Sequence, residues 1–246
     1  MTYQAAIQLY LQAYNHSRFD LQAVLFDMDG VLFDSMPIHA YAWGKTLQEL
    51  GLHFSEEECY LHEGRTGSGT INIVYQREYG RDATEEEVQH IYGRKSALFE
   101  SSDEAPVMPG ARELLEQVQK DGLKRILVTG SGQKALLSRL NHFFPGQFTP
   151  SRMVTAFDVT MGKPHPEPYL KGLHKAGITP NQAIVVENAP LGVESAKAAG
   201  LFVVAVNTGK LQDHYLQNAG ADLLFESMAA LNSAWPRLFQ ALSFFR

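Results

Sequence analysis

Cysteine is almost absent from the chain: Cys59 is the only one among 246 residues. An internal disulfide is therefore impossible, and we expect a reducing compartment. Long apolar runs are also missing, since none approaches the roughly 20 residues that span a bilayer. Residues 1–20 lack the basic start of an export signal. We therefore expect a cytoplasmic protein without a membrane partner.

Positive charge is in the minority. The sequence contains 21 Lys and Arg against 27 Asp and Glu, which gives a formal net charge of −6. An acidic chain is a poor partner for nucleic acid or an anionic membrane, although a few local cations still allow a small anionic substrate. We expect no nucleic-acid partner, and the sequence indicates no obligate protein partner.

The chain is rich in alternating strand and helix patterns. A continuous apolar run at residues 23–26 is typical of a central parallel strand. From residue 108 onward, short apolar runs at 126–128, 154–157, 183–186 and 202–206 alternate with amphipathic stretches. Such alternation predicts an α/β fold with a parallel sheet and helices on both faces.

Residues 36–100 differ, because their pattern is helical throughout. Capping boxes at Ser55–Glu58 and Thr84–Glu87 predict two helix starts, and Arg65–Gly69 between them is expected to be a flexible polar loop. This insertion predicts a second, smaller domain. We assign residues 1–19 to an N-terminal helical extension, residues 20–34 and 106–246 to the core, and residues 35–105 to the inserted domain.

Both ends of the chain are predicted to be helical. Tyr3, Ile7 and Leu11 recur at helical spacing near the start. A terminal helix is expected near residues 231–245, started or kinked by Pro236. Three aromatic residues of that segment are expected to lie in the core: Phe239, Phe244 and Phe245.

Polar residues follow the predicted strands at the end where the active sites of open α/β sheets lie. Asp27 and Asp29 follow the first strand, and Thr129 follows the second. Lys163 and the pair Glu187–Asn188 come further along the chain. A parallel sheet would bring all these groups together at one edge.

This set of groups suits phosphoryl transfer. One carboxylate can attack phosphorus and form an aspartyl-phosphate, while a second acts as general acid and base. Mg²⁺ binds oxygen atoms of carboxylates and carbonyls. A lysine offsets the charge of the transferring group, and hydroxyl and main-chain N–H donors hold its oxygens. The sequence therefore predicts a Mg²⁺-dependent enzyme that acts on a small phosphorylated substrate.

The run Val24–Leu32 resembles the first motif of the haloacid dehalogenase superfamily. Thr129, Lys163 and Glu187–Asn188 resemble its second, third and fourth motifs, and Ala189–Gly200 resembles the segment that follows. The inserted helices are similar to the C1-type helical cap of the β-phosphoglucomutase-like branch. The resemblance implies a Rossmann-like parallel-sheet core with an inserted α-helical cap domain.

The resemblance also implies a role for each motif residue. Asp27 would be the nucleophile and a metal ligand, and Asp29 would be the general acid and base, with its main-chain carbonyl on the metal. The expected phosphate-binding residues are Thr129, Gly130, Ser131 and Lys163. Glu187 and Asn188 would complete the Mg²⁺ site. Most relatives carry aspartate in place of Asn188, so we expect either weaker metal binding or a compensating carboxylate.

The cap would select the substrate by closing over the core. The cap residues expected to contact substrate are His39, Arg65, Thr66 and Lys95. Glu63 is the candidate compensating carboxylate at the metal. His39 matches a histidine of sugar phosphomutases, and Lys95 falls near their cap lysine. The arginine that those enzymes carry near Gly67 is missing here, and Arg65 lies two residues earlier.

Glu63 together with Asn188 resembles the inorganic pyrophosphatases of this branch, so hydrolysis of pyrophosphate or of a similarly small phosphate is favoured. One alternative is a β-phosphoglucomutase, which interconverts β-glucose 1-phosphate and glucose 6-phosphate, and another is a sugar-phosphate phosphatase. A catalytically silent binding protein of the same fold is a further alternative, which the intact Asp27 and Asp29 argue against.

Overall fold

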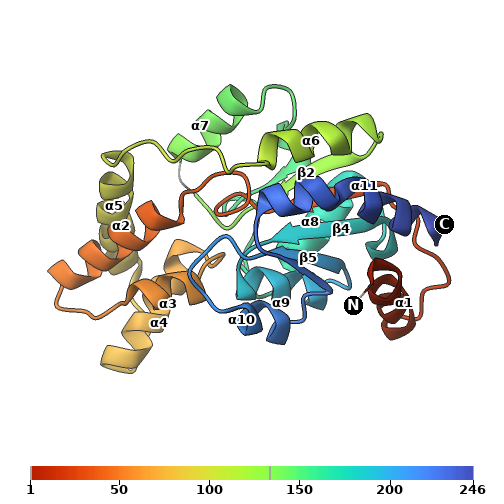
Figure 1. The fold of residues 1–246 in the computed structure, drawn as a ribbon. Coiled ribbons are helices and arrows are strands. Elements are labelled where there is room, and N and C mark those ends of the chain that lie inside the picture. The colour runs from red at the N-terminus through yellow and green to blue at the C-terminus, as the bar shows by residue number, and fades with distance from the viewer. Residues whose placement is uncertain (1, 133, 246) are drawn as a thin grey trace.

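Within residues 2–132 and 134–245, which the computed structural model describes, six parallel strands form one central sheet (Figure 1). The strand order is β3-β2-β1-β4-β5-β6, so β1 lies between β2 and β4 in the middle of the sheet. The strands are β1 (Ala23–Phe26), β2 (Lys124–Val128), β3 (Met153–Val154), β4 (Ala183–Glu187), β5 (Phe202–Val206) and β6 (Leu223–Phe225). The predicted α/β fold is confirmed.

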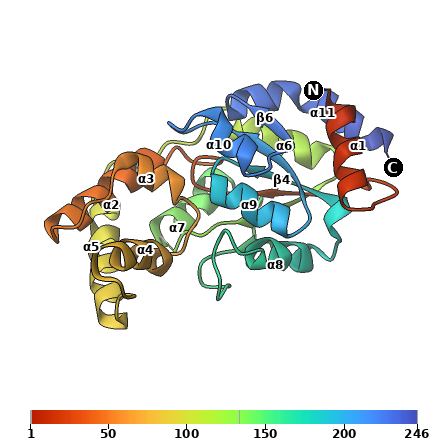
Figure 2. The same ribbon diagram turned by 90° about the horizontal axis from the view of Figure 1, so that it is seen from below.

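Helices cover both faces of the sheet (Figures 1 and 2). One face carries α1 (Tyr3–Ala13), α6 (Ala111–Lys120), α7 (Lys134–Phe143) and α11 (Met228–Phe244), and the other carries α8 (Glu167–Ala176), α9 (Pro190–Ala198) and α10 (Asp213–Asn218). Alternate side chains of β1 pack on opposite faces of the sheet. Val24 and Phe26 pack into one apolar cluster, and Ala23 and Leu25 pack into the other. This double burial explains why β1 is apolar at every position.

The stretch between β1 and α6 is helical and packs beside one end of the sheet (Figure 1). Its helices are α2 (Met36–Glu49), α3 (Glu56–Leu61), α4 (Gly67–Tyr79) and α5 (Glu85–Glu100). They form an apolar cluster of their own, which includes Trp43, Leu47 and Ile71. Both predicted capping boxes are present, and they open α3 and α5. The inserted α-helical cap is confirmed, whereas the residue boundaries given for the three domains stay a prediction.

The flexible loop expected at Arg65–Gly69 is wrong. Thr66 is the N-cap of α4, and its Oγ1 accepts a hydrogen bond from the N–H of Gly69 at 3.2 Å. A threonine in this place contributes about 1 kcal/mol to helix stability. Two glycines in the first turn hide the helix start from the sequence pattern, because glycine is a poor helix former.

The strand predicted at residues 154–157 is shorter than expected and occupies Met153–Val154. Asp158 accepts hydrogen bonds from the N–H and the hydroxyl of Thr155, at 2.8 and 2.9 Å. These bonds form a turn that ends the strand. The short elements α10 and β6 are not predicted by the sequence pattern at all.

Pro236 lies inside α11 rather than at its start. Proline has no N–H for the carbonyl four residues earlier, and that carbonyl, of Asn232, accepts a hydrogen bond from Gln117 Nε2 at 3.2 Å instead. Phe239 and Phe245 pack against the core as predicted, but Phe244 is 74% exposed, so its prediction is wrong. Among the described residues, no helix combines the length and apolar character needed to cross a membrane.

Candidate active site

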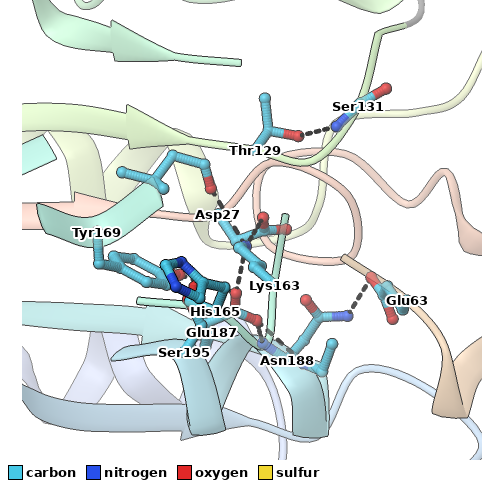
Figure 3. Close-up of polar contacts among 12 residues, drawn as sticks. Asp27, Glu63, Thr129, Ser131, Lys163, His165, Tyr169, Glu187, Asn188 and Ser195 are labelled. Atoms are coloured by element: carbon cyan, nitrogen blue, oxygen red, sulfur yellow. Dashed lines mark hydrogen bonds and ion pairs between the residues drawn. The ribbon is translucent and has the colours of Figure 1, made fainter. Parts of the chain in front are cut away.

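The residues predicted at strand ends meet at one edge of the sheet (Figure 3). Asp27 follows β1, Thr129 follows β2, and Glu187 ends β4. Lys163 reaches this edge from the loop before α8. Its ammonium group donates to Asp27 Oδ1 at 2.6 Å, to Glu187 Oε1 at 2.5 Å and to the main-chain oxygen of Val128 at 3.3 Å. Each of the three ammonium hydrogens therefore has an acceptor.

Asp27 lies at the centre of this cluster and is buried. Burial raises the pKa of Asp27 to about 8; the charge of Lys163 opposes the rise, and the charges of Glu187 and Asp29 add to it. A nucleophile must be ionised to attack, and a nearby cation favours the ionised form of a carboxyl group. The site thus calls for more positive charge than Lys163 supplies.

Glu187 is bonded entirely to protein groups. Its Oε1 accepts from Lys163 and from the Tyr169 hydroxyl, the latter at 2.8 Å. Its Oε2 accepts from the main-chain N–H groups of Asn188 and Ala189 at 2.9 and 3.1 Å. This geometry suits a carboxylate that holds Lys163 in place, and the expected role of Glu187 as a metal ligand stays a prediction.

Sequence reasoning misses two residues that support Glu187. Tyr169 is fully buried on α8, with its ring centre 5.2 Å from the Lys163 ammonium (Figure 3). Gly192, in the first turn of α9, leaves room for the Glu187 carboxylate, which a Cβ atom there would overlap. The only sequence signals are a tyrosine six residues after the motif lysine and a glycine five residues after the motif glutamate.

A chain of buried hydrogen bonds connects Asp29 to the cap. Ser35 Oγ donates to Asp29 Oδ1 at 2.6 Å, and His39 Nε2 lies 3.2 Å from the same oxygen. Lys95 Nζ lies 2.7 Å from His39 Nδ1. Because an ammonium group can only donate, Nδ1 is the acceptor and the imidazole proton lies on Nε2, facing Asp29.

The pKa shifts of the residues in this hydrogen-bonded series have separate physical causes. Burial, together with the charge of Lys95, lowers the pKa of His39, and burial lowers the pKa of Lys95 to about 8. Burial alone would raise the pKa of Asp29. The interaction with His39 and the hydrogen bond from Ser35 outweigh that effect and hold the Asp29 pKa below its ordinary value. Asp29 is therefore an ionised carboxylate at neutral pH, in the form that can accept a proton.

Glu63 enters the site from the cap loop that follows α3. It is buried, and its Oε1 accepts a hydrogen bond from Asn188 Nδ2 at 2.9 Å (Figure 3). Burial, followed by the charge of Asp27, raises the pKa of Glu63 well above its ordinary value. Gly30 permits this approach, since a Cβ atom there would overlap the Asn188 amide. A cap carboxylate therefore contacts the motif amide directly.

The remaining predicted residues divide into two groups. Thr129, Gly130 and Ser131 line the same cavity as Asp27, and Arg65 faces them from the cap. Thr129 Oγ1 also accepts a hydrogen bond from the N–H of Ser131 at 3.0 Å. Thr66 is not among the lining residues, and its hydroxyl is used in capping α4. The structure therefore gives Thr66 a structural task and does not bring it to the candidate site.

A family model described as haloacid dehalogenase-like hydrolase matches residues 21–200. The chain belongs to this family. It is 34% identical over 184 residues to Hexitol phosphatase A of Escherichia coli, which covers 74% of this chain and 82% of that protein. It is 31% identical over 217 residues to Phosphorylated carbohydrates phosphatase of Thermotoga maritima, covering 86% and 97% of the two chains.

A solved structure is more similar still. It belongs to a protein from Bacteroides vulgatus that is provisionally named a beta-phosphoglucomutase. The two chains are 55% identical, each is covered over 98% of its length, and the TM-score is 0.95. The likeness places this haloacid dehalogenase-like hydrolase in the β-phosphoglucomutase-like branch, as its motifs predict.

In this hydrolase the strand ends and the cap line a partly open cavity of about 60 Å³. Asp27, Asp29 and Thr129 line it from the core, and Glu63 and Arg65 line it from the cap. Pockets for drug-sized ligands typically measure several hundred Å³. The space is therefore small, and these polar groups share its lining with apolar side chains that include Trp43, Phe54 and Tyr92.

The oxygen atoms at the site fit a hard divalent cation such as Mg²⁺. Asn188 Oδ1 is buried and has no hydrogen-bond partner within the described part of the chain, which leaves a buried acceptor to be satisfied. Among residues 2–132 and 134–245, no three His, Cys, Asp or Glu side chains are grouped closely enough to hold a metal by themselves. The fitting donors are instead mixed: the carboxylates of Asp27 and Glu63, the amide oxygen of Asn188, and the main chain at Asp29.

Proposed function

We propose that this haloacid dehalogenase-like hydrolase is a Mg²⁺-dependent phosphohydrolase whose preferred substrate is inorganic pyrophosphate. One observation carries the proposal: the cap contributes Glu63 as a buried carboxylate that is hydrogen-bonded to Asn188. A carboxylate in this position supplies the negative charge that Asn188 lacks as a metal ligand. It also takes up space next to Asp27 that a sugar would need.

The residues of the chain can carry out both halves of the reaction. A carboxylate oxygen of Asp27 forms a bond to phosphorus, and the bridging P–O bond breaks and releases phosphate. Lys163, Thr129 and the N–H groups of the loop after β2 bind the oxygens of the transferring group. Asp29 then takes a proton from water, and the water oxygen bonds to phosphorus while the bond between Asp27 and phosphorus breaks, which releases the second phosphate and restores the Asp27 carboxylate.

The cation would be held by Asp27, Asn188, Glu63 and the main chain at Asp29. When bound, Mg²⁺ supplies positive charge that offsets the negative charge of the phosphate groups and favours ionised Asp27. Arg65 lines the cavity from the cap, and its guanidinium group would bind the second phosphate of the substrate.

A sugar-phosphate substrate is the second candidate. The curated relatives named above act on hexitol and carbohydrate phosphates by name, and the 55% identical neighbour carries the name of a beta-phosphoglucomutase. The buried chain Asp29–His39–Lys95 also favours this candidate, because a mutase must deliver and remove a proton at a sugar hydroxyl. Glu63 and the small cavity weigh against it.

The first test compares phosphate release from pyrophosphate and from small sugar phosphates in the presence of Mg²⁺. We expect kcat/KM to favour pyrophosphate by about a hundredfold, or ~2.7 kcal/mol of differential transition-state binding. Little or no turnover of pyrophosphate would contradict the proposal. In that case β-glucose 1-phosphate with glucose 1,6-bisphosphate as activator is the next assay, and formation of glucose 6-phosphate would identify a mutase.

We further propose that the enzyme works in the cytoplasm without an obligate protein, nucleic-acid or membrane partner. The single cysteine and the net charge of −6 support this view. Fractionation of the source cells and a native mass measurement of the purified protein would test it.

A further inference from the structure

The core presents glycine to the cap at several separate contacts. The residues concerned are Gly130, Gly132, Gly162 and Gly209. A Cβ atom on any of them would lie within 3.2 Å of an atom of the cap. None of them has a positive φ, so their backbone conformation does not itself require glycine. The feature that they share is the absence of a side chain where the cap rests on the core.

Gly130 makes the most restrictive of these contacts. A Cβ atom there would overlap the main-chain oxygen of Gly64 and lie 2.9 Å from its carbonyl carbon. At Gly132 the nearest cap atom is instead the Tyr92 hydroxyl at 3.2 Å, and at Gly209 it is the Tyr60 ring at 3.0 Å. Side-chain ends can rotate away, but the main chain of the cap loop cannot. The cap loop and the phosphate-binding loop therefore touch backbone to backbone at Gly130.

This contact lies beside the groups that define the substrate site. Gly64 directly follows Glu63 and directly precedes Arg65, and Gly130 lies between Thr129 and Ser131. The distance between the two loops thus sets how far the Glu63 carboxylate reaches toward Asn188. Glu63 in turn accepts a hydrogen bond from the Asn188 amide, whose oxygen is buried and without a partner in the described chain.

We propose that Gly130 determines substrate specificity by letting the cap loop rest directly on the phosphate-binding loop. The resulting gap admits a substrate the size of a diphosphate and excludes phosphoesters with bulky leaving groups. The identity of the small substrate rests on the proposed function above, but the dependence on size does not. A side chain at position 130 would lift Glu63 and Arg65 together and enlarge the leaving-group side of the cavity.

The test is Gly130→Ala, with kcat and KM measured for pyrophosphate, p-nitrophenyl phosphate and a hexose phosphate. To regain van der Waals contact the cap loop must move by about 1 Å, and a misplacement of that size can cost about a hundredfold in rate. We expect kcat/KM for pyrophosphate to fall by about 30- to 100-fold. For the two larger substrates we expect it to change by less than about threefold or to rise.

Gly132→Ala is the matched control, because it introduces the same methyl group two residues away against side-chain ends that can move. It should leave the ratio of kcat/KM values between small and large substrates within about twofold of wild type. An unchanged ratio of kcat/KM values in Gly130→Ala would overturn the proposal, whether activity falls equally on all substrates or does not fall. An equal loss would mean that Gly130 acts only in binding the transferring phosphate.

Two further measurements keep the result interpretable. If Gly130→Ala does not yield folded protein, Gly162→Ala tests the same idea, because its Cβ would lie 2.9 Å from Thr66 Cγ2 and 3.2 Å from the main-chain nitrogen of Thr66, at the end of the same cap loop. Gly162→Ala should shift the ratio of kcat/KM values between small and large substrates in the same direction by about threefold. The absence of such a shift would overturn the proposal. If the wild type does not hydrolyse pyrophosphate, the proposed function fails, and the size dependence is then judged on the smallest and largest substrates that it does accept.

Discussion

The core side and the cap side of the site are built differently. On the core side, Asp27, Lys163 and Glu187 are held by one another and by the main chain at the strand ends. On the cap side, Glu63 has its hydrogen bond across the interface, to Asn188. The core groups can keep their arrangement when the cap moves, whereas the position of Glu63 depends on how the cap rests on the core.

This difference suggests a division of labour. In the proposed mechanism the core groups would contact only the transferring phosphoryl group and would act on it whatever is attached to it. The cap groups Glu63 and Arg65 line the same cavity, and under the proposal they would determine which substrates are accepted. Substitutions in the core should therefore abolish activity with every substrate, and substitutions in the cap should change the order of preference.

The largest expected effect is that of Asp27→Asn. Loss of the nucleophile should lower kcat by about a thousandfold or more with every phosphate substrate, equivalent to at least ~4 kcal/mol. Asp103→Asn, an exposed position outside the site, is the matched control and should behave like wild type. Residual activity above about a tenth of wild type, in a preparation free of contaminating phosphatase, would remove Asp27 from its assigned role.

Glu63→Ala should have the next largest effect and should separate the two sides of the site. We expect kcat/KM for pyrophosphate to fall by about a hundredfold and the Mg²⁺ concentration for half-maximal activity to rise. Activity toward sugar phosphates should be retained or improved, because the carboxylate no longer fills the cavity. Glu63→Gln preserves the size of the side chain but not its charge, so it should show the Mg²⁺ effect without the gain in sugar-phosphate turnover.

Two outcomes would speak against this role for Glu63. An unchanged Mg²⁺ titration in Glu63→Ala would show that the carboxylate does not reach the metal. An equal loss of activity toward pyrophosphate and sugar phosphates would mean that Glu63 acts like the core groups. The proposed difference between the core side and the cap side would then be wrong.

The contrast also explains what the sequence could predict. The core side can be predicted from local sequence, because an apolar run followed directly by a polar residue indicates both a strand and its exposed end. Asp27 and Thr129 each stand in such a place, and so the sheet and its polar edge are predictable from the pattern. The short strand β3 is mispredicted, because a turn made by Asp158 ends it.

The cap side carries no such local mark, because burial there depends on how helices pack. Arg94 and Lys95 are adjacent on α5 and look alike in sequence. Arg94 pairs with Glu49 on the surface, whereas Lys95 is 2% exposed and bonded to His39. One residue of an α-helix turns the side chain by about 100°, and only the tertiary structure decides which of the two faces inward.

Lys95→Met tests this buried charge and should separate stability from activity. The Lys95 pKa lies at about 8 in the folded protein, below its ordinary value of 10.5, because burial disfavours the ammonium. Replacing the charge with an apolar side chain of similar size should stabilise the protein at pH 7 by about 1–3 kcal/mol. Activity should fall by about tenfold, because His39 loses the donor that fixes its tautomer.

The pH dependence gives the sign of the stability effect. A base whose pKa is lowered by folding reduces the free energy of unfolding while it is protonated. The wild type should therefore become more stable relative to Lys95→Met as pH rises from about 8 to about 10.5. Thermal unfolding of the two proteins across this range would measure the gap. A variant less stable than wild type at pH 7 would show that the Lys95 contacts with Trp43 and Phe99 outweigh the cost of burying its charge.

Lys210→Ala should have the smallest effect. Lys210 Nζ lies 2.6 Å from Glu56 Oε1 and joins the loop after β5 to cap helix α3, but both side chains are more than half exposed. Exposed ion pairs contribute about 0–1 kcal/mol and are screened by salt. KM for the preferred substrate should therefore change by less than about twofold at physiological ionic strength. A larger change would mean that this exposed pair, rather than the glycine contacts and the Glu63–Asn188 bond, holds the cap against the core.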